Sequence, residues 1–270
     1  MLQKQTFDWM RQQLTGLMRT QIMAAAATLS LAEHFHHGPR TVEEMASLTG
    51  LERELTFRLL RALAAIGVVA RADERTFAAL PPLEPLRSTV PGSLRDLAML
   101  FATPGQYVPW SYFLRGLTTG EPQATTALEA ELFAYDGQHP DEVAIFPKTM
   151  PVRTAGVTAA MGPRLDTSKS RMAVDVGGAT GVLLSSLLPR NPQLQGIVYD
   201  RPENVARAQA AAMALGLAAR STAVAGDFFA SVPAGDLYLL RFMLHDWNDA
   251  DGIRILNTTW KVSVFRLRTP

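Results

Sequence analysis

The sequence contains no cysteine, and this absence removes several kinds of chemistry at once. Disulfides, thiolate metal sites and cysteine nucleophiles are all excluded. The chain also lacks an excess of charge of either sign, since 26 lysines and arginines oppose 25 aspartates and glutamates, for a formal charge of +1. This balance gives no electrostatic basis for binding nucleic acid or an anionic membrane.

Long apolar runs are missing as well. The alanines at 24–27 form a patch that is too short to span a bilayer, and the amphipathic start MLQKQTFDWMRQQ has no signal-peptide core. We therefore expect a cytoplasmic protein with no membrane partner. With 270 residues, of which 47% are hydrophobic, the chain can bury a sizeable core, and its length predicts two structural units.

The first third of the chain predicts a helical unit of winged-helix type. Residues 1–35 carry apolar positions at helical spacing. Thr41, followed three residues later by Glu44, predicts a capping box at the start of a short helix. A second helix is expected over 51–63 and a small hairpin over 67–77. Helix, turn, helix and hairpin in this order are typical of a winged helix.

Strands and helices alternate in the last third, which predicts an α/β domain with a doubly wound parallel sheet. Strands are expected over 172–176, 196–199, 221–225 and 236–240, with helices over 181–188, over 203–215 and from about 249. The predicted domains are a winged-helix domain over 1–92, a helical connector over 93–165 and the α/β domain over 166–270. Within the connector, a helix is expected over 146–161.

The stretch MAVDVGGATG at 172–181 is an apolar strand that leads directly into a glycine-rich turn. Gly177, Gly178 and Gly181 suit a turn whose backbone approaches a ligand, because no Cβ stands in the way. The next strand ends in Asp200, at the spacing where a Rossmann-type site places its ribose-binding acid. Together these features predict a nucleoside-cofactor site.

Two further segments are expected at the same edge of the sheet. Asp227, in AGDFF, can accept from an adenine amino group, with Phe228 or Phe229 covering the ring, although a turn or helix cap is the alternative role for Asp227. His245, in LLRFMLHDWND, can take a proton near neutral pH and so suits a general base for a hydroxyl. A structural loop histidine is the alternative there.

The run VDVGGATG, YDRPENV, AGDFF and LLRFMLHDWND, in this order, resembles the S-adenosylmethionine-dependent O-methyltransferases of the caffeate, hydroxyneurosporene and acetylserotonin type. The segment at 31–69 resembles the winged-helix dimerisation domain of that family, so the resemblance spans roughly residues 15–256. It implies a Rossmann-like methyltransferase sheet, S-adenosyl-L-methionine as cofactor, a small hydroxylated aromatic acceptor and a homodimer. The apolar stripe that can form the subunit interface or core comprises Leu14, Leu17, Met18, Ile22 and Met23.

The resemblance also assigns roles to individual residues. For the cofactor it implies Asp175, Gly177, Gly178 and Gly181 near the methionine part, Asp200 at the ribose, Asp227 and Phe228 at the adenine, and Arg241 where plant relatives often have a contacting lysine. For the acceptor it implies His245 as the catalytic base, Asp246 beside the acceptor, and Phe146 and Met150 on the helix that lines its pocket. No metal is implied, and His34, His36 and His37 have no partnering acids in obvious register.

After Leu256 the chain reads NTTWKVSVFRLRTP and departs from the family pattern. The resemblance implies the rest of a helix and three more strands there, so it predicts an incomplete sheet whose fourth strand is an open edge. The tail has β-rich character, with Val262, Val264 and Phe265, and does not resemble the expected helix, whereas the stretch 262–267 is able to pair with that edge. Turnover is then expected to be weak or absent, because His245 lacks an orienting acid, while cofactor binding persists.

Two other functions fit parts of the sequence. A winged-helix regulator with a nucleoside-sensing α/β half would read DNA with the helix over 51–63, but across residues 40–75 six arginines oppose six acidic side chains. That balance is unfavourable for phosphate contacts. An NAD-dependent dehydrogenase would also use the glycine turn and Asp200, but the GGxxG spacing after Asp175 and the His245-Asp246-Trp247 segment fit it less well.

Overall fold

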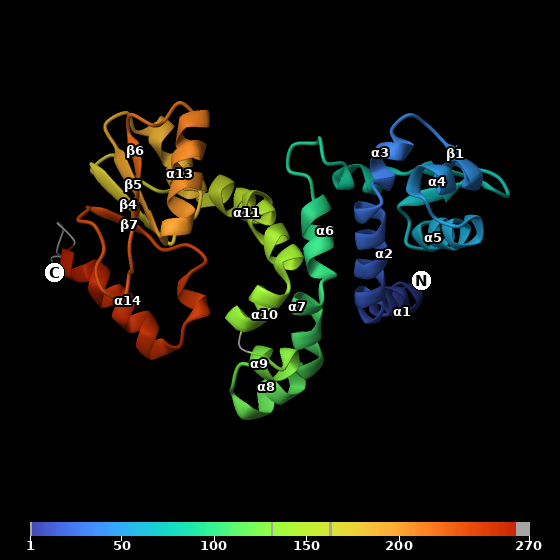
Figure 1. The fold of residues 1–270 in the computed structure, drawn as a ribbon, viewed down its shortest axis with the longest axis horizontal. Coiled ribbons are helices and arrows are strands. Elements are labelled where there is room, and N and C mark those ends of the chain that lie inside the picture. Colours follow the sequence, from blue (N-terminus) through green and yellow to red (C-terminus); the bar gives the residue numbers. More distant parts are fainter. Residues whose placement is uncertain (1, 131, 162–163, 263–270) are drawn as a thin grey trace. The chain divides into compact units, whose positions relative to one another are not determined.

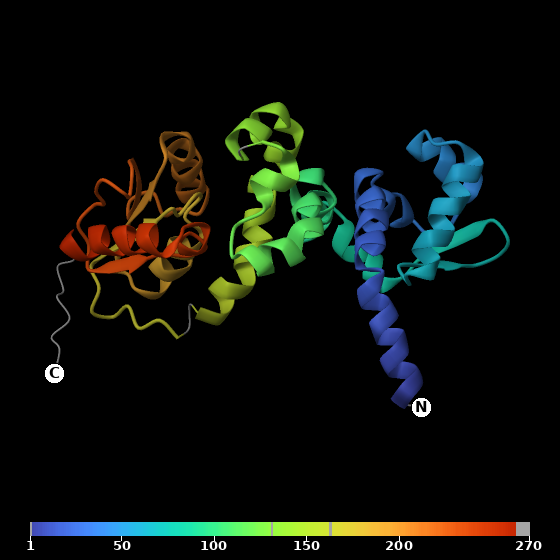
Figure 2. The same cartoon turned by 90° about the horizontal axis from the view of Figure 1, so that it is seen from below.

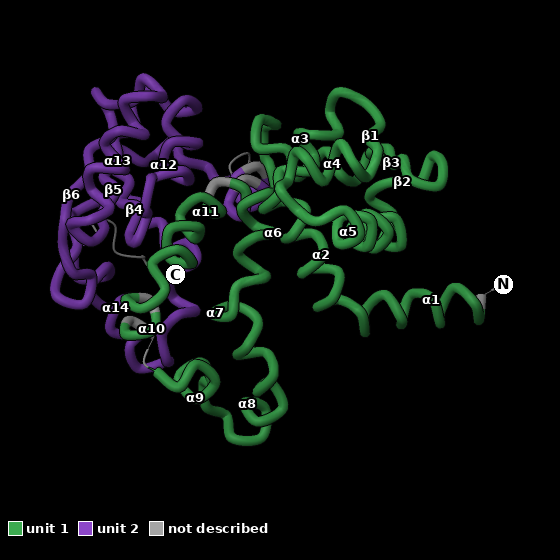
Figure 3. Tube along the Cα trace, turned by 45° about the vertical axis from the view of Figure 1, so that its right-hand side comes forward, with its two compact units in different colours: residues 1–152 green, residues 153–270 purple. Residues whose placement is uncertain are grey.

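A computed structural model describes residues 2–130, 132–161 and 164–262, and the chain divides into two compact units, 1–152 and 153–270 (Figures 1 and 3). The three-part division made from the sequence remains a prediction, because the helical connector does not separate as a unit of its own. Among the described residues, no helix is both long enough and apolar enough to cross a bilayer.

The first unit begins with helices and a small three-stranded sheet. Its elements are α1 (Leu2–Leu14), α2 (Gly16–Thr28), α3 (Leu31–Phe35), β1 (Arg40–Thr41), α4 (Val42–Thr49), α5 (Arg53–Ala65), β2 (Val69–Arg71) and β3 (Thr76–Ala79). The strands pair antiparallel in the order β1-β3-β2, which confirms the predicted hairpin and adds a strand to it. The predicted helical stretch over 1–35 is divided into three helices, because Ser30 adopts a left-handed φ of 53° between α2 and α3.

The capping box at the start of α4 is confirmed. The Thr41 hydroxyl accepts from the Glu44 N–H at 3.2 Å, and the Glu44 carboxylate accepts from the Thr41 N–H at 2.8 Å. This reciprocal pair satisfies two backbone donors that the first turn of a helix otherwise leaves free. Behind it lies the core of the unit, in which the fully buried side chains include Leu31, Val42, Met45, Leu60, Leu63 and Phe77.

Short helices follow the winged-helix region and lead into one long helix. They are η1 (Pro81–Leu86), α6 (Arg95–Phe101), α7 (Pro104–Tyr107), η2 (Val108–Tyr112), α8 (Phe113–Thr119), α9 (Ala124–Leu128), α10 (Leu132–Gln138) and α11 (Pro140–Met161). Helix α11 begins six residues before the predicted start at Phe146. Proline is favoured in the first helical turn, and the carboxylates of Asp141 and Glu142 complement the positive end of the helix dipole.

The second unit is a parallel sheet covered by helices on both faces (Figures 1 and 2). Its elements are β4 (Met172–Val176), α12 (Val182–Leu187), η3 (Leu188–Arg190), β5 (Gln195–Asp200), α13 (Pro202–Ala214), β6 (Ser221–Ala225), β7 (Leu237–Leu239), η4 (Leu244–Asp246) and α14 (Asp249–Val262). The strand order is β6-β5-β4-β7, and every pair is parallel. The predicted doubly wound sheet is therefore confirmed, with bounds within two residues of those predicted for its strands.

Alternation along β4 explains the two layers. Ala173 faces a cluster that contains residues of α12 and α13, whereas Val174 and Val176 face a cluster that contains Ile255 of α14. Successive side chains of a strand point to opposite faces, so one buried strand supplies both cores. Because β4, β5 and β6 are parallel and in register, their carboxyl ends meet at one edge, with Asp200 opposite Ala225.

The expectation that the tail after Leu256 is not helical is wrong as far as Val262, because α14 continues to that residue. Ile255, Thr259 and Val262 recur at the spacing of one helical face, and the first two are buried. Packing against the sheet therefore decides the conformation, despite the β-rich composition. Val264, Phe265 and the proposed edge pairing beyond Val262 lie outside the described residues.

Candidate active site

The glycine turn connects the carboxyl end of β4 to α12, as predicted. Gly177 and Gly181 have left-handed φ values of 65° and 71°, and Ala179 between them has a φ of 50°. A methyl group on Gly181 would lie 2.6 Å from Val198 Cγ2, and one on Gly178 would lie 2.7 Å from Asp175 Cγ. Glycine is thus required here by the protein's own packing, before any ligand is considered.

Asp200 lies at the end of β5, next to the glycine turn. Its Oδ2 accepts from the Ala179 N–H at 2.7 Å, and its Oδ1 accepts from the Arg201 N–H at 2.7 Å and from Asn204 Nδ2 at 2.9 Å. The carboxylate is therefore fixed in orientation by three donors, and it ties the turn to the neighbouring strand. The sequence predicted Asp200 as a site residue but not Ala179 or Asn204. The sequence signal for Asn204 is its position four residues after Asp200, in the first turn of α13.

Asp175 is buried beneath the turn, with 2% of its surface exposed. Its Oδ2 accepts a long hydrogen bond of 3.4 Å from the Leu184 N–H. Burial raises the pKa of Asp175 from 3.8 to about 6, against the lowering effects of the Leu184 bond and of the positive charge of Arg241. Asp175 therefore contacts and shapes the turn from below.

Arg241, which follows β7, carries the complementary charge. Burial lowers the pKa of its guanidinium, and the attraction of Asp175 does not overcome this effect. Its Nε and one terminal nitrogen are buried and have no hydrogen-bond partner among the described residues. A buried, unsatisfied guanidinium is costly, so these N–H groups are available for an anionic ligand.

The raised pKa of Asp175 predicts a pH-dependent stability. The folded chain holds this proton more tightly than the unfolded chain, so the free energy of unfolding falls as the pH rises from about 4 to about 6. Above that range the ionised carboxylate costs about 3 kcal/mol. We expect Asp175→Asn to be more stable than the wild type by about 1–3 kcal/mol at pH 8 and to match it near pH 4. Urea unfolding at both values measures this, and parallel pH profiles would contradict it.

The third strand contributes Asp227 and an aromatic cluster. Asp227 Oδ1 accepts from the Phe229 N–H at 2.8 Å, a bond within its own loop, and Oδ2 accepts no hydrogen bond from the part of the chain that the structure describes. The ring centroids of Phe228 and Phe229 lie 5.0 Å apart, and Trp247 meets Phe229 edge-on at 4.7 Å. The guanidinium of Arg254 lies over Phe229 at 4.7 Å. Trp247 was not predicted as a site residue, since an exposed tryptophan has no distinctive spacing.

His245 lies in η4 on the segment after β7, with 62% of its side chain exposed. Its Nε2 is 3.3 Å from Asp246 Oδ1, so the two neighbouring residues form an exposed ion pair whenever the imidazole is protonated. The ring of Phe242 meets the His245 ring edge-on, with the centroids 6.1 Å apart. The structure thus brings together His245, Asp246 and Arg241 on one short segment.

Phe146 and Met150 lie on α11, outside the sheet unit. They are four residues apart and therefore share one face of the helix. Phe146 is exposed and Met150 is partly buried. Their predicted place in an acceptor pocket remains a prediction.

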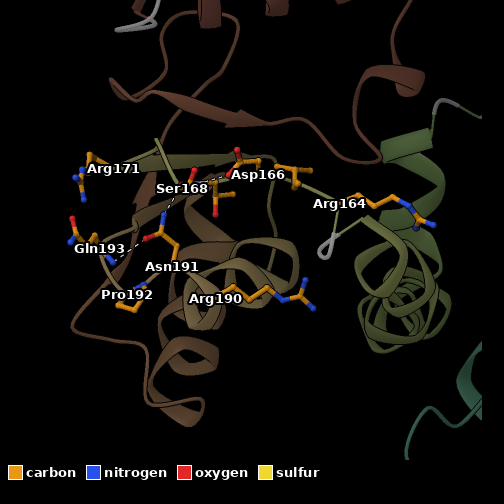
Figure 4. A pocket seen from close by; sticks show the side chains of 10 residues that line it. Arg164, Asp166, Ser168, Arg171, Arg190, Asn191, Pro192 and Gln193 are labelled. Atoms are coloured by element: carbon orange, nitrogen blue, oxygen red, sulfur yellow. Dashed lines mark hydrogen bonds between the residues drawn. The ribbon is translucent and has the colours of Figure 1, made fainter.

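A hollow of about 690 Å³ lies at the opposite end of the sheet, where β4 and β5 begin. Arg164, Arg171 and Arg190 line it, but their side chains extend in different directions (Figure 4). The side-chain amide of Asn191 already donates hydrogen bonds to the backbone oxygens of Thr167 and Ser170. No convergent set of donors forms there, so this hollow is not the predicted site. Within the described ranges no three histidine or acidic side chains gather as a metal site requires.

Comparison with known proteins bears on both units. Residues 12–81 match the family model of an O-methyltransferase dimerisation domain, and residues 110–263 match that of an O-methyltransferase domain. The phenazine O-methyltransferase PhzM of Lysobacter antibioticus is 35% identical over 247 residues, which cover 91% of this chain and 72% of that protein.

Solved structures agree with this result. The mitomycin 7-O-methyltransferase MmcR superimposes with a TM-score of 0.86 at 28% identity, covering 97% of this chain and 78% of that one. The O-methyltransferase NcsB1 from neocarzinostatin biosynthesis, solved in complex with S-adenosylmethionine and 2-hydroxy-5-methyl naphthoic acid, has a TM-score of 0.77 at 29% identity, covering 90% and 76%.

Proposed function

The chain belongs to the S-adenosylmethionine-dependent O-methyltransferases, and we propose that its cofactor site is the carboxyl edge of the sheet and that His245 is its general base. The observation that carries this proposal is the bond between Ala179 N–H and Asp200 Oδ2. It fixes the acid at the end of β5 against the glycine turn, where open α/β sheets bind their ligands.

The residues at this edge fit the cofactor by charge and by shape. The carboxylate of the methionine part suits the unpaired N–H groups of Arg241, because guanidinium and carboxylate form paired hydrogen bonds. Asp200 Oδ2 accepts one hydrogen bond and keeps an acceptor site for a ribose hydroxyl, and Asp227 can accept from an adenine amino group through Oδ2. Phe228, half-buried in the aromatic cluster, offers an apolar face to the base.

The chemistry requires little from the protein beyond alignment and one proton transfer. When bound, S-adenosylmethionine supplies a methyl group already activated by positive sulfur. His245 takes the proton of the acceptor hydroxyl, which makes that oxygen a better nucleophile. Asp246 then stabilises the imidazolium, since its Oδ1 lies 3.3 Å from His245 Nε2.

The acceptor class follows from the relatives and from α11. PhzM is named for a phenazine and NcsB1 was solved with a naphthoic acid, both flat aromatic compounds. Phe146 and Met150 would present an aromatic and a thioether side chain from one helix face, which suits such rings. We therefore propose a small hydroxylated aromatic acceptor.

His245→Gln tests the catalytic assignment. We expect methyl transfer from labelled S-adenosylmethionine to a panel of hydroxylated phenazines and naphthoates to fall by roughly 100-fold or more, because general-base catalysis contributes this much. Binding of S-adenosylhomocysteine should change less than about threefold, since His245 makes no predicted cofactor contact. Equal loss of binding and transfer would reject the role of base.

The exposed apolar face of α1 and α2 supports a homodimer. Leu14, Leu17 and Met18 of the predicted stripe are exposed, whereas Ile22 packs against the core. Exposed apolar side chains that gather in this way favour an interaction site, and they lie in the segment that matches a dimerisation domain.

Light scattering tests the dimer directly. We expect the wild type to be a dimer at micromolar concentration and the double substitution Leu17→Glu with Met18→Glu to be a monomer, because two carboxylates would be buried without partners. Leu215→Glu, at an exposed leucine of the sheet unit, is the matched control and should leave the dimer intact. A monomeric wild type would overturn the proposal.

A further inference from the structure

Phe242 has a backbone conformation that its side chain makes unfavourable. Its φ is +52°, in the left-handed region that residues with a Cβ rarely adopt. Of the described non-glycine residues with positive φ, which are Ser30, Glu129, Ala179 and Phe242, only Phe242 carries an aromatic ring. Such strain persists where the surrounding structure compensates for it, and it concentrates at functional sites.

Burial of the ring does not explain this conformation. Phe242 is 42% exposed, whereas the core of the sheet unit buries its neighbour Met243 and packs against the partly buried Leu244. The turn itself is needed, since Met243 Cβ lies against Gly177, 3.5 Å from where a methyl group on that glycine would be. Glycine at position 242 would make the same turn without strain. Neither the turn nor burial therefore explains why position 242 carries an aromatic ring.

The Phe242 ring contacts two side chains, those of Arg241 and His245. The Arg241 guanidinium lies over it, 5.4 Å from its centroid, and the ring meets that of His245 edge-on, with the centroids 6.1 Å apart and the planes at 89°. Both geometries are attractive, one between a cation and an aromatic face and the other between two rings. Arg241 is attracted by the buried charge of Asp175. The Phe242 ring thus contacts both a partly buried guanidinium and an imidazole that is largely exposed.

We propose that Phe242 is a positioning residue that orients the His245 ring toward the acceptor. The inference rests on the proposed role of His245 as base. Orientation matters there because an exposed histidine samples several rotamers, and a general base must lie within hydrogen-bond distance of the proton that it removes. Among the described residues, the charged side chain paired with His245 is Asp246, which is 62% exposed, whereas Phe242 is less exposed, at 42%.

Three substitutions separate orientation from backbone strain. Phe242→Ala removes the ring and keeps the strained φ, Phe242→Gly removes both, and Phe242→Tyr keeps the ring. The first measurement is the proton NMR signal of the His245 imidazole in the ligand-free protein, assigned by its loss in His245→Gln. In the Ala and Gly variants we expect this signal to move toward that of free imidazole, because the aromatic ring that meets it edge-on is gone. Phe242→Tyr should resemble the wild type.

The second measurement is methyl transfer. Turnover at saturating substrates should fall roughly 10-fold in the Ala and Gly variants and recover in Phe242→Tyr, with the Kd for S-adenosylhomocysteine within about threefold of the wild type. Trp260→Ala, which removes an exposed ring elsewhere in the sheet unit, is the control for nonspecific effects.

The NMR signal and the rate of methyl transfer distinguish failure of this inference from failure of the proposed function. If the wild type shows no transfer, the proposed function fails in this chain, while the NMR comparison still decides whether Phe242 orients His245. An unchanged His245 signal in Phe242→Gly, which relieves strain and should fold, would overturn the inference. So would equal turnover in the Gly and Tyr variants.

Discussion

Replacing Gly181 by alanine should destabilise the sheet unit by about 2–5 kcal/mol. Two effects add here. An alanine would have to adopt a φ of +71°, which costs about 1–2 kcal/mol for a residue with a Cβ. Its methyl group would also lie 2.6 Å from Val198 Cγ2, and Val198 belongs to the buried core between β5 and α12. Overpacking of this kind costs about 1–3 kcal/mol.

Gly216→Ala separates the two effects. Gly216 has a nearly equal φ of +68°, but a methyl group there would meet nothing within 4 Å. This variant should therefore lose only the conformational part, about 1–2 kcal/mol. Urea unfolding of both proteins gives the comparison. If Gly181→Ala were no less stable than Gly216→Ala, the close packing of the glycine turn on β5 would be refuted.

The second large effect is expected from Asp200→Ala. We predict a loss of at least about 100-fold in the affinity for S-adenosylhomocysteine, or roughly 3 kcal/mol. The substitution removes the acceptor for the ribose hydroxyls, and hydrogen bonds to a charged group are worth about 1.5–3 kcal/mol each. It also leaves the Ala179 N–H of the glycine turn without its acceptor. Isothermal titration calorimetry measures the change.

Asn204→Ala is the matched control for this loss. It removes the Nδ2 donor to Asp200 Oδ1 but leaves the carboxylate and its bonds to Ala179 and Arg201 in place. We expect less than about a fivefold change in affinity, as for one neutral donor. If both variants bound S-adenosylhomocysteine as tightly as the wild type, Asp200 would not be a cofactor ligand.

The sheet could be predicted closely because its signals are local. The strand over 172–176 is apolar and is bounded by a polar segment and a glycine turn, and the acid at 200 ends the next strand. Parallel topology then places these ends at one edge without knowledge of any side chain. The capping box of Thr41 and Glu44 could be predicted equally well from the sequence, since its two residue types have a fixed spacing.

Other features depend on packing that the sequence does not display. The burial of Asp175 under its own turn and the unpaired N–H groups of Arg241 arise from contacts between separate strands. The left-handed conformation of Phe242 runs against the preference of its side chain, so propensity predicts the opposite. Helix α14 continues to Val262 because a buried face outweighs β-rich composition. Such sites are where local rules are expected to fail.

We propose that the carboxyl edge of this sheet binds S-adenosylmethionine. Calorimetric titration of the chain with S-adenosylhomocysteine tests it most directly, because no acceptor is needed. We predict saturable binding with a Kd on the order of micromolar, abolished by Arg241→Met, which removes the unpaired guanidinium. Absence of binding by a wild-type chain that unfolds cooperatively in urea, or undiminished binding by Arg241→Met, would contradict the account.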